Sequence, residues 1–83
     1  MMGPIRLQIW SPEAVLVDGQ VEHVTLPGIC GPFEVLKDHA ALITALEPGL
    51  IRYTDEEGEK SLAVEAGFVE VLHNEVKVCI EER

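Results

Sequence analysis

The stretch that decides the fold runs from Leu26 to Gly49 and reads LPGICGPFEVLKDHAALITALEPG. Two Pro-Gly pairs, Pro27-Gly28 and Pro48-Gly49, frame it. Each pair suits a type II turn, because Pro presets φ at the second position and Gly supplies a positive φ at the third. Between the pairs lie a short apolar strand at 33–36 and an apolar run of small residues at 40–46. The pattern therefore indicates short extended segments separated by tight turns.

The run at 40–46 leaves two secondary structures open. Asp38 could cap a helix there, and propensity alone favours that helix. The alternative is a turn at His39 followed by a strand.

Turn signals recur at short intervals along the rest of the chain, and the segments between them favour strands. Ile5, Leu7 and Ile9 alternate with polar residues, which predicts a strand with one apolar face. The signals are Ser11-Pro12, Asp18-Gly19, Pro27-Gly28, Lys37-Asp38, Pro48-Gly49, Glu57-Gly58 and His73-Asn74. We expect a tight hairpin at Asp18-Gly19 and a solvated hairpin tip at the acidic cluster 55–59. Together these features predict an all-β sandwich or barrel.

Length and composition narrow the class of protein further. The chain has 83 residues, enough for a single domain spanning 1–83, and a net charge of −9, which repels nucleic acid. Cys30 and Cys79 form no CxxC motif and are expected to be free thiols in a reducing compartment. Residues 1–6 lack a signal-peptide pattern, and no apolar run approaches the ~20 residues that span a bilayer. Any membrane association is therefore expected to go through a partner.

No constellation for chemistry can be assembled from the sequence. His23, His39 and His73 are too widely spaced for a metal site, and neither serine has a nearby base. No glycine-rich phosphate loop is present, so we expect no catalysis, metal, cofactor or small-molecule ligand. One alternative is a lipoyl-like or biotinyl-like carrier domain, since these are also small acidic β-sandwiches, but Lys37 and Lys60 lack the carrier motif.

In order, the motifs Leu-Pro-Gly, Gly-x-Phe, Val-Leu, His-Ala, Ala-Leu and Pro-Gly within 26–49 resemble the N-terminal β-sandwich of the epsilon subunit of F-type ATP synthase, called delta in mitochondria. The stretch 64–71, VEAGFVEV, resembles the second signature of that family. The resemblance implies a sandwich of about ten strands and favours a strand over a helix at 40–46. The chain departs from the family where Gly, Pro-Gly, Pro and a second Gly are usual, at Glu34, Lys37-Asp38, Ala41 and Ala66.

The resemblance also implies a function and two interfaces. It implies a non-catalytic rotor subunit of the central stalk that binds gamma and the ring of membrane c subunits, at the cytoplasmic face of the bacterial inner membrane, and couples proton flow to ATP synthesis. The ring-facing residues implied are Ile29, Cys30, Gly31, Pro32, Glu34, His39 and Ala40. The gamma-facing residues implied are Trp10, Ser11, Leu42, Thr44 and Ala45.

Many family members continue as a C-terminal two-helix domain that can inhibit hydrolysis and in some members binds ATP. The present sequence has no helical period after the apolar strand at 76–80. The expectation is therefore a form without that domain, which neither inhibits itself through an extended helix nor binds ATP.

Overall fold

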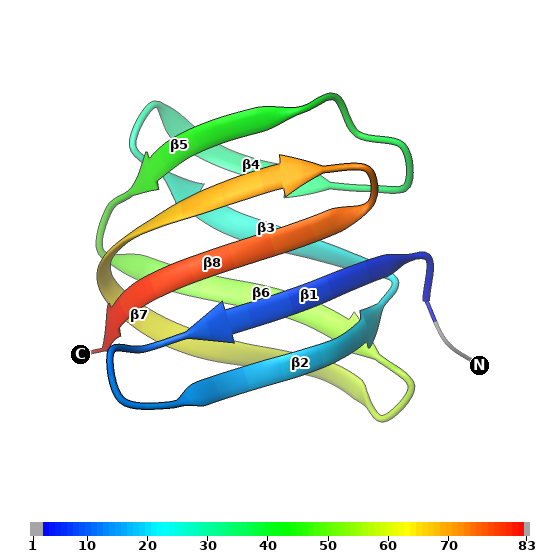
Figure 1. Cartoon of the computed structure of the whole chain (residues 1–83), viewed down its shortest axis with the longest axis horizontal. Coiled ribbons are helices and arrows are strands. Elements are labelled where there is room, and N and C mark those ends of the chain that lie inside the picture. The colour runs from blue at the N-terminus through cyan, green and yellow to red at the C-terminus, as the bar shows by residue number, and fades with distance from the viewer. Residues whose placement is uncertain (1–2, 83) are drawn as a thin grey trace.

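The computed structural model describes residues 3–82, which form a two-layer β-sandwich without helices (Figure 1). Expectations that concern Met1, Met2 and Arg83 lie outside these residues. The strands are β1 (Ile5–Trp10), β2 (Val15–Val21), β3 (His23–Gly28), β4 (Gly31–Val35), β5 (Leu42–Leu46), β6 (Gly49–Asp55), β7 (Gly58–Leu72) and β8 (Glu75–Glu82). The all-β class and the sandwich are confirmed, with eight strands in this part of the chain where about ten were expected.

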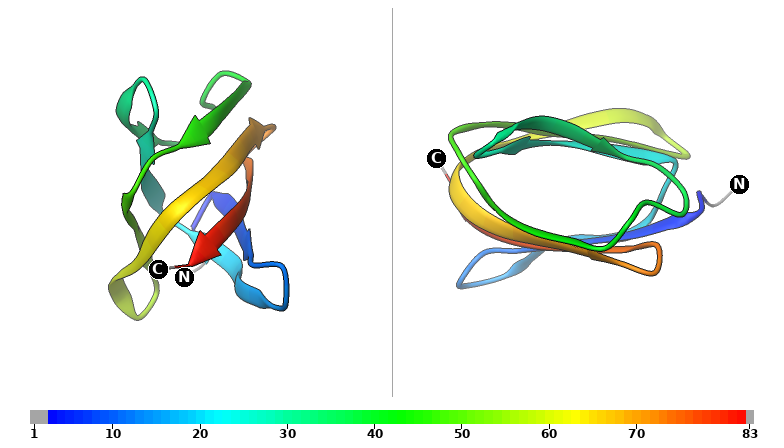
Figure 2. Two further views of the ribbon diagram at one scale, coloured as in Figure 1. Left: turned by 90° about the vertical axis from the view of Figure 1, so that its left-hand side faces the viewer. Right: turned by 90° about the horizontal axis from the view of Figure 1, so that it is seen from above.

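Strand order follows from the pairing. One layer runs β2-β1-β8-β7-β5, and the other contains β4, β3, β6 and the first half of β7. All the pairs are antiparallel except β1 with β8. The long β7 belongs to both layers, because its first half pairs with β6 and its second half with β5 and β8. Figure 2 shows β7 curving from one layer into the other.

The core lies between the two layers and is built from the strand alternation that the sequence predicts. In β1, Ile5, Leu7 and Ile9 are fully buried, and their partners in β8 include the equally buried Val76 and Val78. No polar or charged residue among the described ones is fully buried. Burial of aliphatic side chains is therefore the main stabilising term, at about 1.5–3 kcal/mol for each side chain.

The type II turns predicted at the two Pro-Gly pairs are not formed. Pro27 and Gly28 lie at the end of β3, and the turn follows them at 29–30, closed by the pairing of Gly28 with Gly31. Gly31 has the positive φ of 126°, whereas Gly28 and Gly49 do not, so neither Pro-Gly pair forms a type II turn. Pairing with the neighbouring strand overrides the local turn preference at Pro27-Gly28.

Asp18-Gly19 is also not a hairpin turn. Both residues lie within β2, where Asp18 pairs with Gln8 and Gly19 with Leu7. The connection from β1 to β2 is made earlier, where the Ser11 N–H donates to the Ala14 carbonyl at 2.9 Å. The pairing with β1 thus keeps Asp18-Gly19 extended.

The remaining turn predictions are confirmed. The segment 55–58 closes the β6–β7 hairpin, and His73-Asn74 joins β7 to β8. The ambiguous run at 40–46 contains β5, which pairs with β7 through Leu42↔Val71 to Leu46↔Gly67. A turn with Asp38 at φ 64° precedes it, so the strand is correct and the helix is not formed.

Candidate partner-binding surfaces

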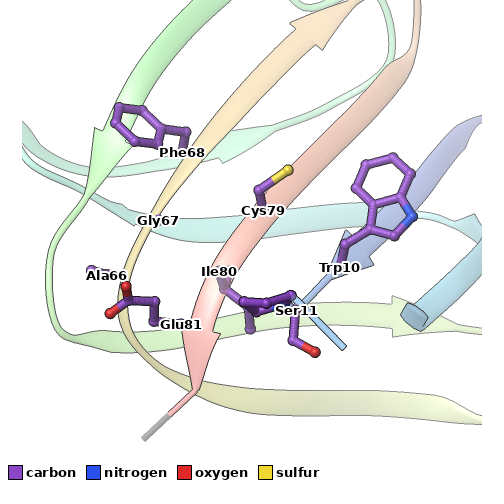
Figure 3. A pocket seen from close by; sticks show the side chains of 9 residues that line it. Trp10, Ser11, Ala66, Gly67, Phe68, Cys79, Ile80 and Glu81 are labelled. Carbon is purple, nitrogen blue, oxygen red and sulfur yellow. The ribbon is translucent and has the colours of Figure 1, made fainter. Parts of the chain in front are cut away.

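A row of apolar side chains crosses the outer face of the β2-β1-β8-β7-β5 layer. The strand register places one residue of each strand in this row: Ala45, Phe68, Cys79, Trp10 and Val15. Phe68 is 65% exposed and Val15 57% exposed. Figure 3 shows the side chains of Phe68, Cys79 and Trp10 on the neighbouring strands β7, β8 and β1. We call these five residues the apolar row.

The apolar row is hollowed at its centre. A pocket of about 330 Å³ is lined by Trp10 on β1 and Phe68 on β7, with Cys79 of β8 between these strands. Gly67, which precedes Phe68, and Ser11, at the start of the loop after β1, also line it. Gly67 carries no side chain, and a Cβ there would overlap the carbonyl oxygen of Cys79. The absence of a side chain at Gly67 thus permits the close approach of β7 and β8 beneath the pocket. Such an apolar hollow fits a bulky side chain of a partner better than a polar one.

A row of mainly charged and polar residues borders the apolar row. Its members lie two residues further along β5, β7, β8 and β1, and three along β2, where a bulge shifts the register; they are Ile43, Glu70, Lys77, Gln8 and Asp18. Ile43 is 73% exposed, the highest value among the large hydrophobic residues that the structure describes, and extends the apolar surface at the β5 edge. The surface therefore has an apolar centre and a partly charged border, which is the usual anatomy of a protein–protein interface.

The structure divides the predicted gamma-facing residues between two sides of the layer. Trp10, Ser11 and Ala45 lie at the apolar row or its pocket. Leu42 packs against the core, and Thr44 pairs with the buried Val69. Because side chains alternate along a strand, Leu42 and Thr44 point away from Ile43 and Ala45. The assignment of all five residues to one interface stays a prediction.

Phe68, Ile43 and Val15 are exposed residues of this surface that sequence reasoning missed. A signal was present, because Val69 and Val71 fill the core and period-2 alternation then directs Phe68 outward. A buried aromatic residue usually just fills the core, whereas an aromatic residue that faces solvent from a strand marks a candidate binding surface.

The predicted ring-facing residues lie along one edge of the sandwich, at the two ends of β4. Ile29 and Cys30 form the exposed β3–β4 turn, followed by Gly31 and Pro32 at the start of β4. Half-buried His39 and exposed Ala40 lie in the loop after the other end of β4. Both ends appear along the top of Figure 1. The structure therefore brings these residues to a common edge but not to one compact tip.

Glu34, the unusual acid in this set, lies on the outer face of β4. Its Oε2 lies 3.1 Å from His23 Nδ1 on β3. The other ring nitrogen, Nε2, lies 3.2 Å from Thr54 Oγ1 on β6. His23 thus lies against both neighbouring strands, with its Nδ1 within ion-pair distance of Glu34 although this nitrogen forms no aligned hydrogen bond within the described part of the chain.

The acidic β6–β7 hairpin holds its own counter-charge. Lys60 Nζ lies 3.0 Å from Asp55 and 2.6 Å from Glu57. The hydrogen bond from Lys60, with a second from the Glu57 backbone N–H, lowers the pKa of Asp55, and the two carboxylates raise the pKa of Lys60. Lys60 is therefore held by its neighbours, whereas a carrier domain presents a free lysine.

No metal-binding cluster of three or more His, Cys, Asp or Glu residues occurs among residues 3–82. In the same range, no helix is long and apolar enough to cross a membrane.

The sequence of residues 4–82 matches the family described as ATP synthase, Delta/Epsilon chain, beta-sandwich domain. The chain belongs to this family. It is 40% identical over 78 residues to the ATP synthase epsilon chain of Carboxydothermus hydrogenoformans, covering 94% of the present chain and 58% of that relative. It is also 40% identical over 81 residues to the epsilon chain of Desulfitobacterium hafniense, covering 98% and 61%. The resemblance inferred from 26–49 and 64–71 is thereby confirmed.

Solved structures show the same fold. A chain in the mitochondrial ATP synthase of Euglena gracilis superposes with a TM-score of 0.86 at 21% identity, covering 94% of the present chain and 51% of that chain. A chain in the central stalk and c-ring structure from Tetrahymena thermophila gives a TM-score of 0.81 at 11% identity, covering 98% and 66%. The present chain spans only part of the length of the two epsilon chains above, 58% of the first and 61% of the second.

Proposed function

We propose that the protein is a non-catalytic rotor subunit of the central stalk of a proton-translocating F-type ATP synthase. Membership of the delta/epsilon family supports this function. The single observation that carries it is the exposed apolar row across five adjacent strands, a surface suited to burial against another protein. The row with Ser11 is the proposed gamma contact, and the β4 edge with its flanking turns is the proposed c-ring contact.

In this proposal the sandwich acts as a rigid clamp between gamma and the ring. Binding energy comes from covering Phe68, Trp10 and their neighbours, while loop residues at the β4 edge meet the polar loops of the c subunits. Torque passes through the two interfaces, and the domain performs no chemistry and needs no cofactor. The protein is then a peripheral membrane protein at the cytoplasmic face of the bacterial inner membrane.

Co-expression with the cognate gamma subunit tests the first interface. We expect the two proteins to elute as one species from a size-exclusion column at micromolar concentration, because the apolar row is covered in the complex. Independent elution would count against the proposed function. An intact-mass spectrum showing lipoylation or biotinylation at Lys60 would favour a carrier domain instead.

The second interface is tested in membrane vesicles that contain the assembled synthase. The double variant His39→Ala with Cys30→Asp changes one half-buried and one exposed side chain at the two ends of the β4 edge, and neither belongs to the buried core. We expect ATP hydrolysis to continue with reduced proton pumping, because the ring contact is weakened while the gamma contact remains. Normal coupling in these vesicles would refute the assignment of this edge to the ring.

A further inference from the structure

Two turns that lie far apart in sequence are joined by a reciprocal pair of side-chain hydrogen bonds. The Asp38 backbone N–H donates to Asn74 Oδ1 at 2.6 Å, and Asn74 Nδ2 donates to Asp38 Oδ1 at 3.1 Å. Asp38 belongs to the β4–β5 loop and Asn74 to the β7–β8 turn, and the two segments lie side by side in both views of the ribbon (Figures 1 and 2). We call this pair the Asp38–Asn74 clamp.

Backbone strain is concentrated at the clamp. Within residues 3–82, the non-glycine residues with positive φ are Asp38 at 64°, His73 at 51° and Asn74 at 62°. Such conformations cost energy and persist where the surrounding structure fixes them. A further bond supplies that fixation, because the Arg6 N–H donates to the Asn74 carbonyl at 2.9 Å. The β7–β8 turn is thus anchored on β1 and can hold the β4–β5 loop.

His39 immediately follows the clamped residue. Its backbone N–H donates to the Leu36 carbonyl at 3.2 Å, and its Nδ1 lies 2.7 Å from the Ala40 carbonyl oxygen. Its ring lies 6.5 Å from that of Phe33, tilted by 44°. A pocket of about 370 Å³ lies beside the clamp, and His39 and Asn74 are among the residues that line it. The direction of the imidazole therefore depends on the backbone that the clamp fixes.

We propose that Asn74 is a positioning residue for the ring-facing loop, acting through Asp38 to fix the orientation of His39. This inference rests on the proposed ring contact of His39. It adds a residue, Asn74, that lies 36 positions from Asp38 in sequence and is not itself part of the proposed contact. The clamp pre-organises the loop, so that docking on the ring orders fewer residues than it would with a mobile loop.

Amide hydrogen exchange of the ¹⁵N-labelled full chain tests the clamp itself. Asn74→Gly removes both side-chain bonds and accepts the positive φ without strain. His73→Gly is the matched control, since it also relaxes a positive φ in the same turn but touches neither bond. We expect the His39 amide, whose own bond to Leu36 is unaltered, to exchange at least about fivefold faster in Asn74→Gly, because the loss of even one of the two hydrogen bonds supplies about that factor. His73→Gly should exchange like the wild type.

A conservative variant and a functional measurement complete the test. Asp38→Asn keeps both the backbone donor and a side-chain oxygen acceptor, so it should retain wild-type exchange. In membrane vesicles, Asn74→Gly should lower proton pumping relative to hydrolysis, whereas Asp38→Asn and His73→Gly should not. Unchanged His39 exchange in Asn74→Gly would overturn the clamp. Faster exchange with unchanged coupling would instead support the clamp and count against the proposed ring contact.

Discussion

Replacing Phe68 with Ala should weaken binding to gamma strongly and affect folding little. Phe68 is 65% exposed, so its side chain contributes little to the core of the free protein. A Phe side chain offers on the order of 200 Å², so covering the exposed part removes roughly 130 Å² from water. At about 25 cal/mol per Å², and allowing for the methyl group of Ala, the variant loses about 2–3 kcal/mol of binding free energy. That loss corresponds to a roughly 30-fold to 150-fold increase in Kd.

Isothermal titration of cognate gamma with the wild type and Phe68→Ala measures this difference. Leu50→Ala is the matched control, because Leu50 is 42% exposed on the outer face of β6, in the other layer. We expect Leu50→Ala to bind like the wild type and both variants to unfold at nearly the wild-type urea concentration. Equal Kd values for Phe68→Ala and the wild type, or an equal loss in Leu50→Ala, would refute the assignment of the apolar row to gamma.

Two further predictions concern stability and titration. Gly67→Ala should lower the free energy of unfolding by about 1–3 kcal/mol, measured as a lower Tm, because the new Cβ overlaps the Cys79 carbonyl oxygen. Gly19→Ala, with nothing within 4 Å of its new Cβ, should be neutral or slightly stabilising, and the reverse order would contradict this account. Lys60 lowers the pKa of Asp55 in the folded protein, so their ion pair stabilises the fold at pH values above the ordinary pKa of an aspartate. This stabilisation is lost as the pH falls through the lowered pKa of Asp55. Lys60→Met should therefore raise the Asp55 midpoint in an NMR titration, and an unchanged midpoint would show that the ion pair is absent in solution.

The sequence alone predicted those features that depend on near neighbours in the chain. Alternation with period 2 identified the buried face of β1, because successive side chains of a strand point to opposite sides whatever the strand pairs with. The Glu57-Gly58 and His73-Asn74 turns were also predicted, since Gly and Asn readily adopt the positive φ that these positions have. The ordered motifs in 26–49 and 64–71 were sufficient to identify the family.

Only the tertiary structure decided which residues share a surface. Pro27-Gly28 and Asp18-Gly19 resemble turns locally, but their pairing with β4 and β1 keeps them in strands. Phe68 and Trp10 line one pocket from either side of β8 because of the register of three strands, and no local pattern specifies a register between distant segments. The Asp38–Asn74 clamp likewise depends on two turns 36 residues apart reaching the same edge. Side-chain direction is a local property of the chain, whereas the assembly of a surface requires long-range pairing.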